Sequence, residues 1–270
     1  MVYQVTTTES WEVDGIPLST YAWNVTSLGG RLSTPGLRGS NVEMAYRPGA
    51  EFRPKVAASR SVNLGMWVTA ADPNSDTGLP AGADPRASFM SNLRFLQKLF
   101  YQPGRQLSLK RKWTDLSGSY EATAKAQLVS AINPVMNGRL RATFVVDLLL
   151  ADPFYYGAVQ NVPISGTTVL TNPGDDFSPK NLVISFTGGT NPRLTNNTPS
   201  PVVYVQYTGT VSGTLVVEVS IPRARIGSTV VNSAITSSGS MWWMQLFPGI
   251  NSLTLTGGGT CSVAYTPVYI

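Results

Sequence analysis

The strictest constraint on the fold is an alternating stretch at residues 139–157, RLRATFVVDLLLADPFYYG. Every even position from Leu140 to Leu150 is apolar, whereas the odd positions mix charged, polar and apolar residues. This period of two predicts a strand with one face in a core. Asp152-Pro153 then forces an extended backbone, and the aromatic residues that follow break the alternation. We therefore expect the last strand of one domain here, followed by a joint to a second domain.

The length of 270 residues allows two domains, at 1–157 and 158–270, each large enough to bury its own core. The single cysteine, Cys261, excludes an intramolecular disulfide and lies in an alternating stretch that predicts a buried, inert thiol. Histidine is absent, which removes the commonest general base and the usual zinc ligand. The chain is therefore expected to be no enzyme and to need no metal or cofactor. A glycosidase that uses carboxylates alone stays open, although 15 acidic residues are a thin supply.

Only 13% of the residues are charged, about half the roughly 25% of an ordinary soluble domain. So little charge suggests a surface that other subunits cover, although Ser, Thr and Asn can also keep a β-rich monomer soluble. No apolar run approaches the roughly 20 residues that span a bilayer. The first residues, MVYQVTTTESWEV, lack the basic and apolar regions of a secretory signal. We expect no membrane contact and assembly in a cytoplasm.

The first domain is predicted to be a sheet with one helix. Asp14-Gly15 suits a tight hairpin turn, and strands are expected at 21–28 and 61–70. A helix is predicted to start at Asp84, which can cap it, and Pro85, which presets the first helical φ. Its core-facing residues recur at helical spacing: Phe89, Leu93, Leu96 and Phe100. Pro103-Gly104 is expected to end it. A hairpin is expected between 120–132 and 139–150.

Two stretches of this domain are candidate interaction segments. Residues 29–54 are rich in glycine, proline and arginine with little periodicity, which predicts an arm or hairpin that reaches outward, or else a solvated loop. Its arginines could form bidentate contacts with a neighbour's carboxylates: Arg31, Arg38, Arg47 and Arg53. Lys110-Arg111-Lys112-Trp113 could grip nucleic acid, but no recognised nucleic-acid module surrounds it. A solvated strand face or a subunit contact is favoured there.

The second domain reads as an antiparallel β-sandwich. Short alternating runs separated by Gly, Pro and Asn clusters are expected to be strands at 162–170, 181–187, 202–207, 215–221, 240–247, 252–256 and 262–269. Trp242 and Trp243 form a candidate aromatic surface for a glycan or a partner, with core and interface roles as alternatives. Asp175-Asp176 is too short a fragment to predict a calcium site.

These pieces together resemble the distal tail (Dit) proteins of long-tailed phages, particularly those labelled minor tail proteins in phages of actinobacteria. The resemblance covers nearly the whole chain. Its most specific markers are ADPFYY at 151–156, TNPGD at 171–175 and LFPGIN at 246–251. They are structural rather than catalytic markers, so they predict architecture and assembly.

The resemblance implies a tail-tube-like N-terminal sandwich with one helix and a galectin-like C-terminal sandwich. It implies a hexameric ring at the tail tip of the virion, which connects the tail tube protein to the tail-tip hub protein. The tape measure protein is a further implied partner, and phage DNA would pass through the channel without specific binding. The arm at 29–54 lies where the family inserts a loop that helps build the ring. The alternative function is a carbohydrate-binding module that engages host cell-wall glycans.

Overall fold

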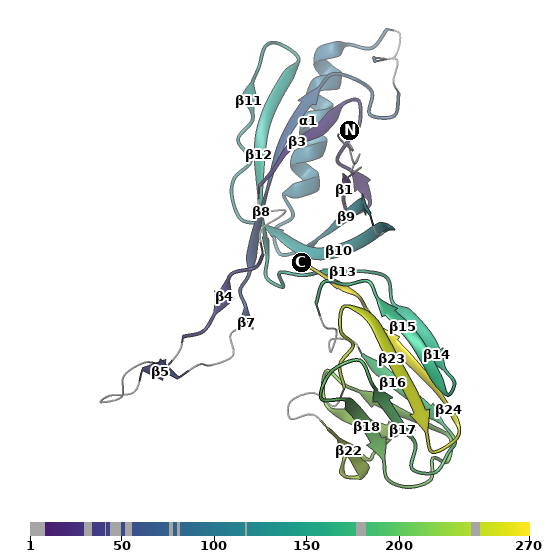
Figure 1. Ribbon diagram of the computed structural model, residues 1–270. Coiled ribbons are helices and arrows are strands. Elements are labelled where there is room, and N and C mark those ends of the chain that lie inside the picture. Colours follow the sequence, from purple (N-terminus) through teal and green to yellow (C-terminus); the bar gives the residue numbers. More distant parts are fainter. Residues whose placement is uncertain are drawn as a thin grey trace, which may run out of the picture. The chain divides into compact units, whose positions relative to one another are not determined.

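The computed structural model describes residues 9–29, 34–40, 42–43, 50–51, 56–75, 78–79, 82–116, 118–176, 182–238 and 244–270. The chain divides into two compact units, one of Met1–Tyr155 with Ile270 and one of Tyr156–Tyr269. Both are built mainly from antiparallel strands, so the predicted mainly β class is confirmed (Figure 1). No helix in the described part is long and apolar enough to cross a bilayer.

A continuous antiparallel sheet forms the first unit. Its strand order is β2 (Ile16–Pro17), β1 (Glu9–Val13), β9 (Leu107–Asp115), β10 (Gly118–Leu128), β12 (Arg141–Leu150), β8 (Arg60–Thr69) and β3 (Trp23–Gly29). A short strand, β11 (Val135–Met136), pairs with β12. The predicted hairpin at Asp14-Gly15 is confirmed, because β1 pairs with β2 and both turn residues have positive φ, 50° and 82°.

The alternating stretch becomes β12, which pairs with β8 along its full length. The apolar residues of these two strands that face the core are buried: Ala142, Phe144, Val146, Leu148, Leu150, Val62, Leu64, Met66 and Val68. Leu140 differs from the prediction, because it precedes the strand and is 38% exposed.

The predicted hairpin between 120–132 and 139–150 is mostly wrong. β10 pairs with β9 from Gly118 to Ala126, and it meets β12 at two residue pairs only, Gln127↔Leu149 and Leu128↔Leu148. A tight turn joins β9 to β10, where Asp115 Oδ1 accepts a hydrogen bond from the Gly118 amide. This short connection favours the β9 partner, and the Asn137-Gly138 turn instead joins β11 to β12.

The helix α1 (Pro85–Phe100) confirms the predicted cap and stripe. The Asp84 carboxylate accepts a hydrogen bond from the Arg86 amide at 2.9 Å, and the four predicted apolar residues are buried. The Asn92 side chain donates to the carbonyl oxygens of Thr69 and Ala71, both at 2.9 Å, which ties the helix to the end of β8. The helix ends at Phe100, three residues before the predicted proline.

Two short ladders occupy the predicted arm. β4 (Leu37–Arg38) pairs with β7 (Val56–Ala57), and β5 (Val42–Glu43) pairs with β6 (Ala50–Glu51). These ladders belong to two-stranded sheets that are separate from the main sheet of the unit. The described part of the arm is therefore a hairpin, as one of the two predictions has it.

The second unit is an antiparallel sandwich. One sheet has the order β14 (Gln160–Ile164), β24 (Thr260–Tyr265), β16 (Val183–Thr187), β19 (Thr214–Glu218), β20 (Arg223–Ile226) and β21 (Thr229–Val230). The other has the order β15 (Thr167–Asn172), β23 (Gly249–Thr256), β17 (Arg193–Asn196), β18 (Val203–Tyr207) and β22 (Ile235–Ser237). Buried side chains from both sheets form a single core cluster.

The remaining short elements are β13 (Tyr155–Tyr156), the 3₁₀ helix η1 (Asn232–Ala234) and β25 (Val268–Tyr269). Several predictions for the second unit were wrong. The expected strand at 162–170 is two strands, because Gly166 turns the chain with φ 57°. The expected strand at 262–269 is likewise two strands, β24 and β25. Four strands lie where none was expected: β17, β20, β21 and β22. Met244–Phe247, the described part of the expected strand at 240–247, is not a strand.

A physical reason explains the error at Met244–Phe247. Met244 and Leu246 are both buried, so the stretch has the alternation of a strand. However, asparagine side chains, not a neighbouring strand, bind its backbone. Asn196 donates to the carbonyl oxygen of Gln245 at 3.0 Å, and Asn251 binds both the amide and the carbonyl of Phe247.

Candidate interaction surfaces

Most of the predicted site residues lie outside the described part of the chain: Arg31, Arg47, Arg53, Trp242 and Trp243. Arg38 is described and lies exposed on β4 of the arm. Leu37 of the arm is 69% exposed, and Val56 on β7, the strand that pairs with β4, is 54% exposed. The roles predicted for the arginines and for the tryptophan pair stay predictions.

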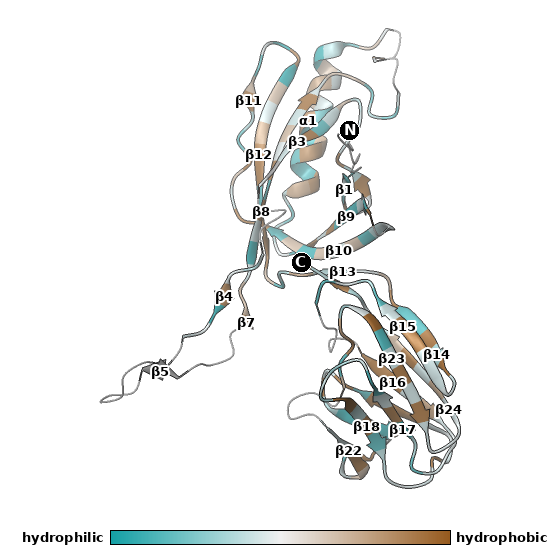
Figure 2. Cartoon of the chain, in the orientation of Figure 1, coloured by the Kyte–Doolittle hydropathy of each residue, from teal (hydrophilic) through white to brown (hydrophobic). Residues whose placement is uncertain are grey.

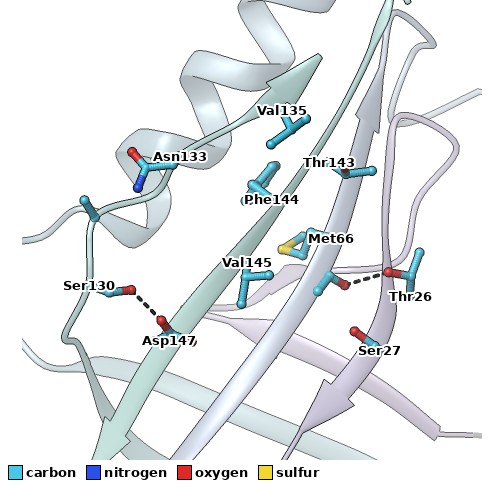
Figure 3. Close-up of a pocket in the computed structure, with 12 residues that line it drawn as sticks. Thr26, Ser27, Met66, Ser130, Asn133, Val135, Thr143, Phe144, Val145 and Asp147 are labelled. Atoms are coloured by element: carbon cyan, nitrogen blue, oxygen red, sulfur yellow. Dashed lines mark hydrogen bonds between the residues drawn. The ribbon is translucent and has the colours of Figure 1, made fainter. Parts of the chain in front are cut away.

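A groove of about 560 Å³ lies on the outer face of β3, β8 and β12 (Figure 3). Its lining residues are Thr26, Ser27, Gly65, Met66, Ser130, Ala131, Asn133, Val135, Thr143, Phe144, Val145 and Asp147. Gly65 lies against a bulge in β3, and an added Cβ there would require the Ser27 hydroxyl to turn away.

Asp147 is the one carboxylate among these lining residues. It accepts hydrogen bonds from the Ser130 hydroxyl at 2.7 Å and from the Asn63 amide (Figure 3 shows the first). These two hydrogen bonds hold the pKa of the Asp147 carboxyl below its usual value. The groove thus lacks the two facing acids that a carboxylate-only glycosidase requires.

The basic run on β9 is matched by carboxylates across the sheet. Lys110 binds Glu121 at 2.7 Å, Lys112 binds Glu12, and Arg111 binds Glu9 at 2.8 Å. These acids come from β10 and β1, so the strand register neutralises the run. Because these side chains are ion-paired, less unpaired positive charge is left on the run to bind phosphate groups.

The aromatic ring beside the run is also occupied. Trp113 stacks on Tyr120 with ring centroids 5.5 Å apart, and the Arg111 guanidinium lies 4.7 Å from the Trp113 centroid. A base would have to displace these contacts before it could stack on the indole. This geometry favours the interpretation of the run as a strand face or a subunit contact.

In the sandwich, the ring of Tyr204 is covered by the guanidinium of Arg193, 3.8 Å from its centroid. A sugar ring could stack on that face of Tyr204 only if the arginine moved. Burial raises the pKa of the Cys261 thiol to about 12, as expected for an inert cysteine. The described residues contain no group of three His, Cys, Asp or Glu side chains that could hold a metal ion.

The outer face of α1 is a further surface, which the sequence reading did not single out. The helix contains three basic residues, Arg86, Arg94 and Lys98, and no acidic one. A groove of about 860 Å³, here the α1 groove, lies at its C-terminal end and is lined by Arg94, Gln97, Lys98, Tyr101, Gln102, Ala131 and Ile132. The absence of acidic residues between Pro85 and Phe100 is visible in the sequence and could have indicated this surface.

The sheet of the first unit has two edges, β3 and β2. In the described part of the chain, β3 pairs with β8 and has no strand on its other side. β2 covers only Glu12 and Val13 of β1. Such edges expose backbone groups that can pair with another chain.

No family model matches the chain, and no curated protein matches it significantly. Among solved structures, the chain matches the crystal structure of the SPP1 Dit (gp 19.1) protein with a TM-score of 0.62 and 15% identity. That protein is described as a paradigm of the hub adsorption apparatus in phages that infect Gram-positive bacteria. The match covers 97% of this chain and 100% of the SPP1 chain. Two structures of the phage p2 baseplate in its activated conformation, with Sr and with Ca, match at a TM-score of 0.41 and 6% identity, over 96% of this chain and 98% of theirs. That second likeness is too weak to support an inference. The chain therefore has the fold of the SPP1 Dit protein.

Proposed function

We propose that this chain is a structural protein of a phage virion, a distal tail adaptor in the hub at the tail tip. The observation that carries the proposal is the fold match to the SPP1 Dit protein over almost the full length of both chains. The ion-paired basic run on β9 and the single, fully engaged carboxylate of the β3–β8–β12 groove favour a role in assembly over one in catalysis.

The proposed assembly is a homo-oligomeric ring, hexameric by the family resemblance. Among the described residues, the sheet has open backbone groups at each edge, so it can make a head-to-tail contact, and such contacts close into a ring when the rotation permits. The ladder of β4 and β7 supports this proposal in two ways. A two-stranded ladder is only marginally stable alone, so contact with a neighbour would stabilise it. The same neighbour would cover the exposed apolar side chains of Leu37 and Val56. Arg38 on the same ladder can then bind a carboxylate of that neighbour.

The ring would join the tail tube protein to the tail-tip hub protein, with the tape measure protein as a further partner. Phage DNA would pass through the channel without specific binding, which agrees with the carboxylates that neutralise the β9 run. Assembly would take place in the host cytoplasm.

Electron microscopy of virions that carry a labelled copy of the chain tests this function. We expect the label at the distal end of the tail, with six copies in each particle. A label on the capsid, along the tube or absent from the particle would refute the proposal.

The arm has its own test by native mass spectrometry. Leu37→Glu should reduce the species of six chain masses because it buries a charge in the proposed contact. Val169→Glu is the matched control, since Val169 is 66% exposed on β15 of the sandwich. Equal assembly of the two variants would remove the arm from the ring contact.

A further inference from the structure

We propose that the outer face of α1 and its groove form a docking site for an acidic, partly apolar segment of another protein. This inference goes beyond the proposed ring, which it neither requires nor supports. It starts from a stripe of side chains at intervals of four residues, Arg86, Met90, Arg94 and Lys98, which lie along one side of the helix. Tyr101 continues the stripe one turn beyond. The buried residues of α1 are centred on a different side of the helix.

The outer face of α1 is positively charged. Arg86, Arg94 and Lys98 are exposed, and no carboxylate among the described residues forms an ion pair with them. The basic residues of β9 differ, because each of them has a carboxylate partner within the unit. The α1 face therefore has positive charge that is available to bind carboxylates of another molecule.

Helix stability does not account for this charge pattern. Lys98 in the last turn favours the helix dipole, but Arg86 lies in the first turn, where a positive charge opposes it. Three basic residues without an acid on the same helix also repel one another weakly. The pattern is thus better explained by a ligand than by folding.

The composition of the α1 face and of the α1 groove favours a protein over a nucleic acid. Tyr101 is 68% exposed and Met90 is 40% exposed, and Ala131 and Ile132 add apolar surface to the groove. Figure 2 shows hydrophilic and hydrophobic bands alternating along α1. Three cations interrupted by apolar side chains would give only weak, salt-dependent phosphate binding. Aromatic and aliphatic residues beside arginine are the usual composition of a protein-binding centre.

The test uses the full chain and fluorescence anisotropy with three labelled probes. The first is a 12-residue peptide in which Glu alternates with Leu and Phe, the second has Gln at every Glu position, and the third is a short DNA duplex. We expect the chain to bind the Glu peptide at least tenfold more tightly than the Gln peptide and the duplex. The double variant Arg94→Glu/Lys98→Glu should weaken binding of the Glu peptide about tenfold or more, as expected when two charge contacts are reversed.

The matched control is Lys125→Glu/Arg139→Glu, which changes the net charge equally at two exposed basic residues outside the α1 groove. It should leave binding within about twofold. Circular dichroism checks that both variants fold, as expected because the replaced side chains are exposed. Equal binding of the Glu and Gln peptides, an equal loss in the control, a preference for the duplex, or no binding of any probe would each overturn the proposal.

Discussion

Replacing Asn251 with alanine should strongly destabilise the sandwich. The Asn251 side chain is fully buried and makes four hydrogen bonds. Its oxygen accepts from the Phe247 amide at 2.9 Å and from Asn196 Nδ2 at 2.8 Å. Its nitrogen donates to the carbonyl oxygens of Phe247 at 2.8 Å and Gly249 at 3.0 Å. Two of these bonds fix Phe247, the last residue of the segment Met244–Phe247, which directly follows the predicted aromatic pair in the chain.

The magnitude follows from these four bonds. At about 1 kcal/mol for each hydrogen bond, and with buried partners left unsatisfied, the alanine variant should lose about 3–5 kcal/mol of unfolding free energy. A loss of 1.4 kcal/mol corresponds to a factor of about ten. Amide exchange in the core strands of the sandwich should therefore become at least about a hundredfold faster.

Hydrogen exchange measured by mass spectrometry suits this test because it resolves the two units separately. Peptides from β16 should exchange faster in the variant, whereas peptides from β8 in the other unit should keep their rate. Ser252→Ala is the matched control, since the described hydrogen bonds of Ser252 come from its backbone. A change below about 1 kcal/mol, or roughly fivefold in exchange, would refute the assignment of Asn251 as the residue that fixes this segment.

Three further predictions concern single side chains. The depressed pKa of Asp147 means that its ionised form stabilises the fold above about pH 3.9, and this contribution is lost as the pH falls through the lowered folded value. Asp147→Asn should therefore flatten the acid side of a stability curve measured by urea unfolding, and an unchanged acid slope would contradict this. Cys261 should not react with an aromatic disulfide reagent at pH 8 until urea is added, because burial raises its pKa to about 12; rapid labelling of the native chain would argue against its burial. Asp84→Ala should cost about 1 kcal/mol and speed amide exchange in the first turn of α1, and unchanged exchange there would mean that the cap contributes nothing.

The sequence by itself determined those elements whose signal is local. The alternation that became β12 and the stripe of Phe89, Leu93, Leu96 and Phe100 both arise from the repeat of a single element. The Asp84 cap and the Asp14-Gly15 turn likewise depend on a few adjacent residues. The sandwich class also followed from local spacing of strands and turns.

Only the tertiary structure decided which elements meet. β10 lies mainly against β9, because strand pairing is set by the whole sheet and by the short turn at Asp115. The alternation at Met244–Phe247 matches that of a strand, yet its backbone is bound by the side chains of Asn196, 49 positions away, and of Asn251. The register of strand pairing places the neutralising carboxylates beside the basic run on β9. Local periodicity is encoded within a few residues, whereas these contacts join residues as much as 102 positions apart and form only when the sheet is complete.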